Sequence, residues 1–455
     1  MSQNRTFPED FIWGAATASY QIEGAATEGG RGPSIWDTFS KTPGKVLHGH
    51  TGDIACDHYH RYESDVKLMA ELGIRSYRFS LAWPRVFPAK GKVLNDGFDF
   101  YKRLLEQLHK HGITPAATIY HWDLPQWIED EGGWSNRAVV DYYLEFAEKA
   151  FRELGDQIPM WITHNEPWCA SLLSYGIGEH APGLRDWRRA YRAAHHLLLS
   201  HGEAVKLYRS LGLKGEIGIT LNLTPAYPAS DSPADLAAAA RQDCFANRWF
   251  LDPIFKGEYP AEFMERVEHF CGDLDVVRPG DLETIATKMD FLGINFYTRS
   301  LVADEPNDPL LGVKHLKTDN PVTDMGWEVY PEALYDLLHR LRQDYTDLPL
   351  YITENGAACA DVVENGNVHD PDRISYVHQH LEAARKFIAE GGNLKGYYLW
   401  SLMDNFEWAF GYTKRFGIIY VDYDTQERIP KDSYKWYRQV IAVNGLPETV
   451  PGTVS

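Results

Sequence analysis

Short runs of apolar, β-branched and aromatic residues recur along the chain, and longer segments of a different pattern separate them. Near-continuous apolar runs are typical of strands in a parallel sheet, because helices cover both faces of that sheet. Eight runs have this character, so the pattern predicts eight strands. They cover residues 11–14, 76–80, 116–120, 160–163, 217–221, 291–295, 350–353 and 397–400.

The segments between these runs have the spacing of amphipathic helices. In residues 136–154 the apolar positions follow i, i+3, i+4, i+7, and a similar pattern covers 57–72. A third helix is predicted over 370–390, where Asp370 can cap the helix and Pro371 suits its first position. Eight strands that alternate with helices favour the α/β class and a single (β/α)8 barrel.

An open, doubly wound sheet is the alternative, but no glycine-rich phosphate-binding fingerprint follows the first strand. Because composition does not change along the chain, we expect one barrel domain over residues 1–446 and an unpacked tail over 447–455. Long segments follow strands one, four, five and six, and residues 299–330 have the composition of a loop. In a barrel, the loops after the strands build the functional face.

Composition and charge narrow the class of protein. The 455 residues are 44% hydrophobic and 24% charged, which is typical of a globular protein with a large core. A net charge of −19 disfavours nucleic-acid binding. No apolar run has the ~18 residues of a membrane span and the start lacks a signal-peptide core, so we expect a cytoplasmic protein without a membrane partner. The five cysteines form no CxxC pair and are expected to be reduced.

Polar residues follow the carboxyl ends of five predicted strands, and barrel geometry brings such positions into one ring. Two carboxylates stand out because each directly follows an apolar run: Glu166 after the fourth strand and Glu354 after the seventh. Two facing carboxylates suit glycoside hydrolysis, in which one protonates the leaving oxygen and the other attacks the anomeric carbon or activates water. Either glutamate alone would more often be a structural carboxylate.

Aromatic residues stand beside hydrogen-bonding residues at several strand ends, as in the segments 121–123 and 405–408. A sugar ring has apolar C–H faces and a polar rim, so this pairing suits a carbohydrate ligand. Most aromatic residues of the chain nevertheless belong to the core.

The segments Thr-His-Asn-Glu-Pro at 163–167 and Ile-Thr-Glu-Asn-Gly at 352–356 resemble the two signature motifs of glycoside hydrolase family one, the retaining β-glucosidase family. Residues 11–24 are similar to its amino-terminal signature. Matches at 77–80, 120–125, 295–297 and 404–408 follow in the same order, so the resemblance covers about residues 5–446.

The resemblance implies that Glu166 is the acid/base and Glu354 the nucleophile of a double displacement, with Arg78 and Tyr297 beside Glu354. We expect Arg78 and Tyr297 to lower the pKa of Glu354, and an apolar pocket to raise the pKa of Glu166.

The resemblance also implies which residues bind the sugar. Asn165 would hold the 2-hydroxyl, Trp400 would stack under the ring, and Trp122 would line the pocket or only pack against it. The 3-, 4- and 6-hydroxyls would be bound by Gln21, His121, Glu407 and Trp408, and Asn295 would support the site. The candidates for the aglycone side are Cys169, Leu173, His180, Asn222 and, most strongly, Trp327.

The implied substrate is a small soluble β-glycoside, such as cellobiose or an aryl glucoside, with some β-galactosidase and β-fucosidase activity. Neither a cofactor nor a metal is implied, and the oligomeric state stays open. Glu407 disfavours a 6-phosphorylated sugar because its carboxylate would repel phosphate, although Lys414 and Arg415 lie nearby in sequence.

Two other functions fit the sequence less well. A sugar-binding protein without catalytic activity could share the fold, but it would not need both carboxylates. A metal-dependent barrel hydrolase would need histidine ligands at the strand ends. The histidines paired by spacing, at 58 and 60, 109 and 111, and 378 and 380, lie in predicted helices, and we expect surface or capping roles for them.

Overall fold

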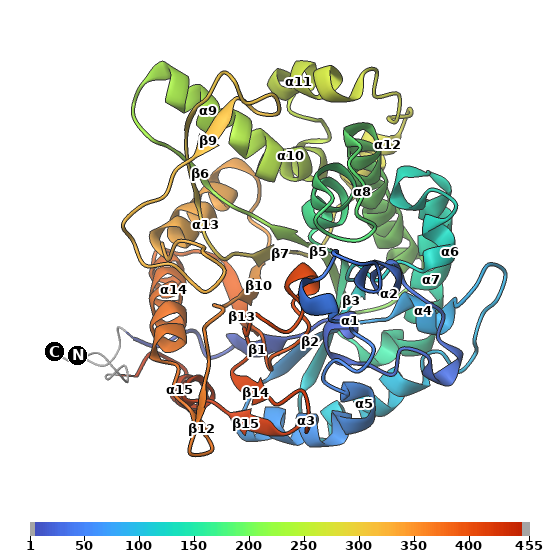
Figure 1. Ribbon diagram of the computed structural model, residues 1–455, viewed down its shortest axis with the longest axis vertical. Coiled ribbons are helices and arrows are strands. Elements are labelled where there is room, and N and C mark those ends of the chain that lie inside the picture. The colour runs from blue at the N-terminus through green and yellow to red at the C-terminus, as the bar shows by residue number, and fades with distance from the viewer. Residues whose placement is uncertain (1–4, 448–455) are drawn as a thin grey trace.

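The computed structural model describes residues 5–447. Eight parallel strands close into a barrel, which confirms the predicted fold class, and each strand overlaps one of the eight predicted runs (Figure 1). The barrel strands are β1 (Ile12–Ala16), β2 (Ser76–Ser80), β3 (Thr114–Tyr120), β4 (Met160–Asn165), β5 (Glu216–Asn222), β7 (Phe291–Asn295), β10 (Leu350–Asn355) and β13 (Leu394–Trp400).

The barrel closes because its first strand pairs with its last. In β1, Gly14 lies opposite Tyr398 of β13 on one side and Ser76 of β2 on the other. A Cβ atom at Gly14 would lie 2.4 Å from the Tyr398 ring, so only glycine permits this close packing. The ends of the described chain also meet, since the Phe7 amide donates to the Asn444 carbonyl at 2.9 Å.

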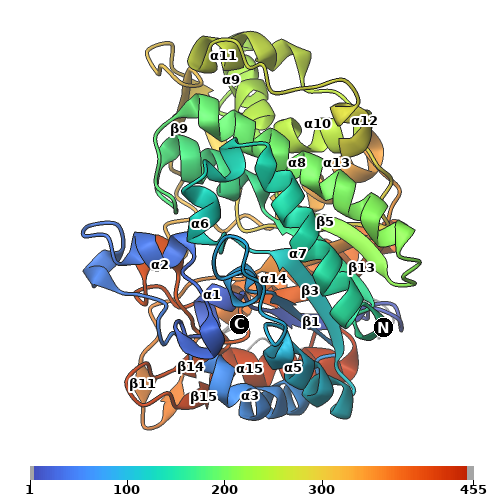
Figure 2. The same cartoon turned by 90° about the vertical axis from the view of Figure 1, so that its right-hand side faces the viewer.

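Helices form a layer around the barrel, as Figures 1 and 2 show from two directions. The three helices predicted from apolar spacing are present with nearly the expected bounds. The surrounding helices are α3 (His58–Leu72), α5 (Asp99–Lys110), α7 (Ala138–Leu154), α8 (Trp187–Ser210), α9 (Pro233–Asp243), α10 (Trp249–Lys256), α11 (Ala261–Cys271), α12 (Asp281–Ile285), α13 (Glu332–Asp344), α14 (Pro371–Ala389) and α15 (Asp432–Val443).

Among residues 5–447, no helix is both long and apolar enough to cross a membrane.

Shorter elements lie in the connections between the barrel strands and the surrounding helices. The short helices are α1 (Ser19–Ile22), α2 (Ile35–Ser40), α4 (Trp83–Val86) and α6 (Gln126–Glu129), and the short strands are β6 (Ala226–Pro228), β8 (Ser300–Asp304), β9 (Val313–His315), β11 (Val363–Glu364), β12 (Asn367–Val368), β14 (Ile419–Val421) and β15 (Arg428–Pro430).

Two local expectations are wrong. Asp370 precedes α14 but does not cap it, because its carboxylate accepts hydrogen bonds from the Ser433 amide at 2.8 Å and from Arg373. The segment 299–330 is not all loop, since β8 and β9 lie within it and join β6 in a three-stranded sheet. Of the predicted tail, residues 448–455 lie outside the described residues.

A buried ion network joins the loops that follow the last two barrel strands. The Lys431 ammonium lies 2.5 Å from the Asp361 carboxylate, after β10, and 2.7 Å from the Asp404 carboxylate, after β13. Arg373 binds Asp361 at 2.7 Å, and Arg415 binds Asp404 at 2.6 Å. Since the side chains of Lys431, Asp361 and Asp404 are at most 1% exposed, each charge depends on its partners for stabilisation.

We predict that Lys431→Met lowers the free energy of unfolding by about 3–5 kcal/mol, because Asp361 and Asp404 each lose one of their two counter-charges. Urea unfolding followed by circular dichroism measures the change. Lys435→Met is the matched control, since the Lys435 side chain is 53% exposed and pairs only with Asp432, at 3.0 Å. Equal effects in the two variants would contradict a structural role for the buried network.

Candidate active site

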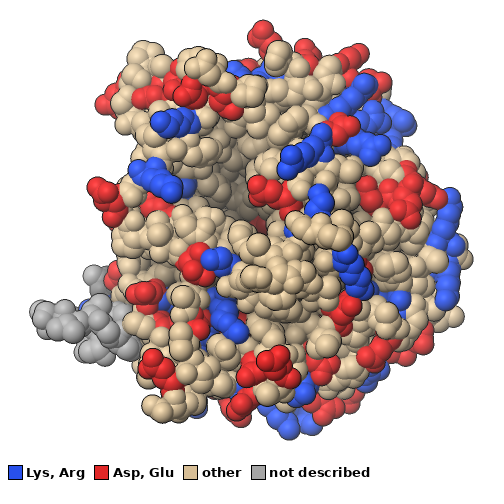
Figure 3. Space-filling model, in the orientation of Figure 1, with Lys and Arg blue, Asp and Glu red and all other residues tan. Residues whose placement is uncertain are grey.

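A cavity of about 360 Å³ lies at the carboxyl ends of the barrel strands. Figure 3 shows the molecule hollowed near the middle of this face, with mostly uncharged atoms around the hollow. The ring of strand-end residues expected from the sequence thus forms one pocket. Its lining includes His121, Trp122, Asn165, Glu166, Asn295, Tyr297, Trp327, Glu354, Trp400, Glu407 and Trp408, together with Cys169, Leu173, His180 and Asn222.

Glu354, near the end of β10, is held by two donors. Arg78, from β2, donates through Nη1 to Oε1 of Glu354 at 2.7 Å, and the Tyr297 hydroxyl donates to Oε2 at 2.6 Å. Arg78 and Glu354 are only 1% and 4% exposed. A charge-assisted hydrogen bond to each oxygen fixes the carboxylate in one orientation and favours its ionised form.

Glu166 directly follows β4 and has a different environment. The Asn295 amide donates to its Oε1 at 2.6 Å, and the Glu166 backbone N–H donates to the Thr220 carbonyl at 2.9 Å. A π-helix over Cys169–Ile177 begins three residues later, and such helices frequently mark functional sites. No cation contacts this carboxylate among the described residues.

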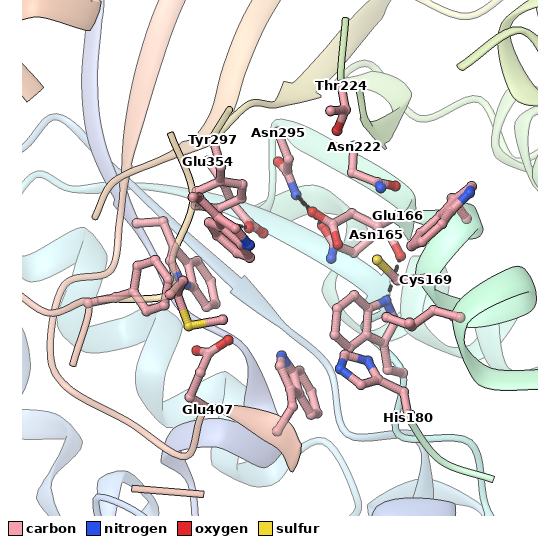
Figure 4. A pocket seen from close by; sticks show the side chains of 18 of the residues that line it. Asn165, Glu166, Cys169, His180, Asn222, Thr224, Asn295, Tyr297, Glu354 and Glu407 are labelled. Carbon is pink, nitrogen blue, oxygen red and sulfur yellow. Dashed lines mark hydrogen bonds between the residues drawn. The ribbon is translucent and has the colours of Figure 1, made fainter. Parts of the chain in front are cut away.

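One hydrogen-bond network connects the two carboxylates through Asn165. Its Oδ1 accepts from Arg78 Nη2 at 2.6 Å and from Asn295 Nδ2 at 3.0 Å. Its backbone carbonyl accepts from Trp122 Nε1 at 2.9 Å, so Trp122 both lines the pocket and supports it. In Figure 4, Asn165, Glu166 and Glu354 face the same space. The network fixes Glu166 and Glu354 relative to each other.

Burial and charge set the protonation of the pair. Burial, followed by the charge of Glu354, raises the pKa of Glu166 to about 8. Burial also raises the pKa of Glu354 above its ordinary value, and the hydrogen bonds from Arg78 and Tyr297 offset part of the rise. Arg78 and Tyr297 therefore lower the pKa of Glu354 as expected, but burial, which the expectation left out, outweighs them and makes the net shift upward. Glu354, which carries the guanidinium contact, still ionises before Glu166.

The end of the pocket away from Glu166 offers unpaired polar atoms. Gln21 donates through Nε2 to Asn405 Oδ1 at 3.0 Å and to the Phe406 carbonyl at 2.9 Å. Its Oε1, and Oε2 of Glu407, are buried without a hydrogen-bond partner among the described residues. Burial, with added charge from Glu354 and Glu166, raises the pKa of Glu407 to about 8. These atoms can bind ligand hydroxyls.

Aromatic rings form the floor of the pocket. Trp122 and Trp408 lie 4.5 Å apart between ring centroids, and the His121 ring is stacked on Trp400 at 6.1 Å. Elsewhere in the lining, the Trp327 and Tyr297 rings pack together with their centroids 5.3 Å apart. Flat apolar faces beside unpaired polar atoms suit a sugar, which presents C–H faces and hydroxyl edges.

Three pocket residues have a left-handed backbone that side chains other than glycine rarely adopt. Glu166, Trp122 and Trp408 have φ angles of 51°, 79° and 46°. Each such residue costs of order 1–3 kcal/mol and persists only where surrounding structure holds it. Because three such residues occur in one pocket, we infer that this backbone cost is tolerated there in order to position the three side chains.

Several residues that line the cavity are not among those predicted from the sequence, and two predicted site residues lie outside the lining. Gln21 and Arg78 do not line the cavity but lie directly behind its wall. Arg78 contacts Glu354 as expected. Trp168 directly follows the Asn-Glu-Pro motif, whereas the other missed residues lie outside the motifs, so only their position after a strand end could have indicated them. They are Trp168, Glu179, Leu223, Thr224, Thr298, Met325, Phe410 and Phe416.

The nearby cations are already paired. Lys414 binds the Asp324 carboxylate at 3.0 Å, and Arg415 binds Asp404. The raised pKa of Glu407 weakens the argument from charge repulsion against a phosphorylated sugar. The pairing of Lys414 and Arg415 replaces that argument, because neither cation is available for a phosphate.

Among the histidines that occur in pairs along the sequence, at least two are buried. His58 is buried and shares a hydrogen bond of 2.7 Å with Asp65, and His380 is buried against the Tyr376 carbonyl at 2.7 Å. Both satisfy core polar groups, so the surface or capping role is wrong for them. Across residues 5–447, no group of three or more His, Cys, Asp and Glu side chains is arranged to hold a metal ion.

A barrel with two buried carboxylates in a pocket at its strand ends is typical of glycoside hydrolases. Comparison with known proteins places the chain in this class. The sequence matches Glycosyl hydrolase family 1 over residues 3–446. The chain therefore belongs to this family.

Individual relatives agree with this assignment over almost the full chain. Beta-glucosidase A of Acetivibrio thermocellus is 51% identical, with 97% of this chain and 99% of the relative covered. A bifunctional beta-D-glucosidase/beta-D-fucosidase of Bifidobacterium breve is 48% identical, over 96% and 98%. The crystal structure of the GH1 beta-glucosidase from Exiguobacterium antarcticum B7 is 54% identical and superposes with a TM-score of 0.95, over 97% and 100%.

We predict that Glu354→Gln lowers the pKa of Glu166 from about 8, because it removes the neighbouring charge. The pKa should remain above the ordinary glutamate value, since burial, the larger cause, is unchanged. Carbon-13 NMR of labelled glutamate side chains measures it. Glu364→Gln, on exposed β11, serves as the control and should leave it unchanged. An unaltered pKa in Glu354→Gln would mean that the two carboxylates do not interact.

Proposed function

We propose that the protein is a retaining β-glucosidase that hydrolyses terminal β-D-glucosyl residues by double displacement. The observation that carries the proposal is the unequal pair of carboxylates in one pocket. Glu354 is bonded to Arg78 and Tyr297, whereas Glu166 has a pKa raised to about 8 and so keeps its proton near neutral pH. One group is suited to attack and the other to donate a proton.

In the first step, the Glu354 carboxylate attacks the anomeric carbon from the face of the sugar ring opposite the glycosidic oxygen. Glu166 gives its proton to the glycosidic oxygen, so the aglycone leaves as a neutral alcohol or phenol. The glycosyl ester that forms removes the negative charge of Glu354. Since that charge is one cause of the raised pKa of Glu166, Glu166 becomes more acidic at the stage where a base is needed.

In the second step, Glu166 takes a proton from water, which attacks the anomeric carbon from the face that the aglycone left. The Glu354 ester breaks, and its carboxylate returns to the bonds from Arg78 and Tyr297. Two inversions give net retention, and the first sugar formed is the β-anomer. Direct attack requires the two carboxyl groups to be about 5–5.5 Å apart.

We assign the sugar-binding roles from the positions of the side chains. Asn165, held by Arg78 and Asn295, presents its amide N–H to the 2-hydroxyl. Gln21 and Glu407 supply the unpaired oxygens for the 3-, 4- and 6-hydroxyls, together with His121 and the indole of Trp408. Trp400 covers a C–H face, and Trp122 lines the wall.

The aglycone side supports small β-glycosides as substrates, such as cellobiose and aryl glucosides. We assign this side to five residues of the pocket lining: Trp327, Cys169, Leu173, His180 and Asn222. The bifunctional relative supports a secondary β-fucosidase activity, and we extend the proposal to β-galactosides. A single catalytic domain over residues 1–446 is part of the proposal.

We also propose a cytoplasmic location. It is supported by the five cysteines, which are free thiols, four of them buried.

We predict that Glu354→Ala lowers kcat for a 2,4-dinitrophenyl β-glucoside by at least about 10⁴-fold and that azide restores turnover. The small anion fills the space of the lost carboxylate and gives an α-glycosyl azide, identified by proton NMR. The exposed Glu364→Ala should retain full activity. A β-azide, or no rescue with a folded variant, would assign the nucleophile to another residue.

We predict that Glu166→Ala slows hydrolysis of an alkyl glucoside by about 10²–10⁴-fold but spares the first step for a dinitrophenyl glucoside, whose leaving group needs no proton. Dinitrophenol should therefore appear in a burst, followed by slow turnover, in a stopped-flow experiment. Azide should then yield a β-glycosyl azide. Equal loss for both substrates without a burst would exclude Glu166 as the acid/base.

A further inference from the structure

A second cavity, of about 450 Å³, adjoins the catalytic pocket on its aglycone side. The two share Trp168, Asn222 and Thr224 in their linings, so a ligand can extend from one into the other. We propose that this cavity, called here the side chamber, binds the distal ring of a two-ring phenolic aglycone. The proposal rests on the proposed β-glucosidase function and names a substrate class for it.

The side chamber lies between elements that are not part of the barrel. On one side are α9 and the β6–β8–β9 sheet, and on the other is the π-helix that follows Glu166 and leads to α8. In Figure 4, Asn222 and Thr224 mark the edge of the catalytic pocket from which the side chamber continues.

The walls of the side chamber are largely apolar. Phe245, Leu311 and Val313 line it and are 5%, 5% and 8% exposed. The Trp168 ring meets the Phe245 ring edge to face at 5.8 Å, so an aromatic wall begins where the two cavities join. Flat apolar ligands gain most from such walls, because they bury area without leaving polar groups unpaired.

One buried polar atom in the side chamber has no partner. Gln242, on α9, is 6% exposed, and its Oε1 accepts no hydrogen bond from the described residues. Buried amide oxygens are almost always paired, so this atom is a candidate acceptor for a ligand hydroxyl. A phenol at the far end of an aromatic aglycone would supply that donor.

The charged groups around the side chamber are already paired. Asp308 accepts from the backbone N–H groups of Leu311 at 2.8 Å and Val313 at 3.3 Å. Arg241 donates to Asp304 at 2.6 Å and to the Leu311 carbonyl at 2.7 Å. A sugar ring would need a partner for each of several hydroxyls. The side chains of Asn222, Thr224, Ser300 and His315 also line the side chamber, but they are half-buried or exposed, so water can satisfy them. The one buried acceptor without a partner among the described lining residues is at Gln242, and together with the apolar walls it fits an aromatic ring with a single hydroxyl.

Three β-glucosides with leaving groups of similar acidity test the proposal: phenyl, biphenyl-4-yl, and 4′-hydroxybiphenyl-4-yl. In the wild type, kcat/KM should rise about tenfold from phenyl to biphenyl-4-yl, because the second ring is buried. The terminal hydroxyl should add about fivefold, through Gln242. Cellotriose serves as the comparison for a sugar in the side chamber.

Two variants locate the effect. Gln242→Leu should lower kcat/KM about fivefold for the hydroxybiphenyl glucoside alone, and Ala246→Leu, which narrows the side chamber, should lower it about tenfold for both biphenyl glucosides. Phenyl glucoside should be unaffected in both variants, which shows that they fold. Gln379→Leu is the matched control, because Gln379 is exposed on α14 and lines a different cavity.

Biphenyl glucosides that react no faster than phenyl glucoside would overturn the proposal. A loss confined to cellotriose in Gln242→Leu would also overturn it and would assign the side chamber to a sugar. Failure of the wild type to hydrolyse phenyl glucoside would instead overturn the β-glucosidase function itself, so the two failures are distinguishable.

Discussion

The guanidinium of Arg78 is the positive charge around which the pocket is organised. It is 1% exposed and would be strongly unfavourable without compensation, so Glu354 must supply the negative charge. The same group reaches Asn165, and through it Asn295 and Glu166. One buried cation thus decides which glutamate is ionised and holds the amide that connects the pair. Its own position is fixed by β2, where Arg78 lies opposite Ala16 of β1 and Ala116 of β3.

The two ends of the pocket are built differently. The end proposed for the terminal sugar is supported by the buried network of Lys431, Asp361 and Asp404, which anchors the loops after β10 and β13. The proposed aglycone end is lined by the π-helix after β4, by the end of β5 and by the segment between β9 and α13, which carries Trp327. The proposed sugar end is therefore tied to a buried ion network, whereas much of the proposed aglycone end comes from connecting segments.

The sequence was sufficient to predict the barrel and most of the site. Parallel strands buried on both faces leave a strong apolar signal, and barrel geometry places residues such as Glu166 and Glu354 in one ring. Elements that depend on tertiary contacts could not be predicted. The strand β8 has partly exposed positions and no clear alternation, and Asp370 gives up its capping role because Ser433 and Arg373 compete for it.

The direction of the pKa shift of Glu354 could not be predicted from the sequence. The neighbours of Glu354 were identified from motifs, but the sign of its pKa shift depends on how much water is excluded, which only the packed structure shows. Gln242 illustrates the same limit. It lies on a helix after β5, in no motif, and only its burial without a partner distinguishes it from other glutamines.

Closure of the barrel by β1 and β13 also has a consequence for biosynthesis. The residues that line the pocket extend from His121 to Phe416, and the strand that closes the ring ends at Trp400. A ribosome must therefore complete almost the whole chain before the pocket can exist. A partly synthesised chain can form helices and some strand pairs, but it cannot cleave a glycoside. The moment at which activity appears during translation would thus mark when β1 and β13 pair.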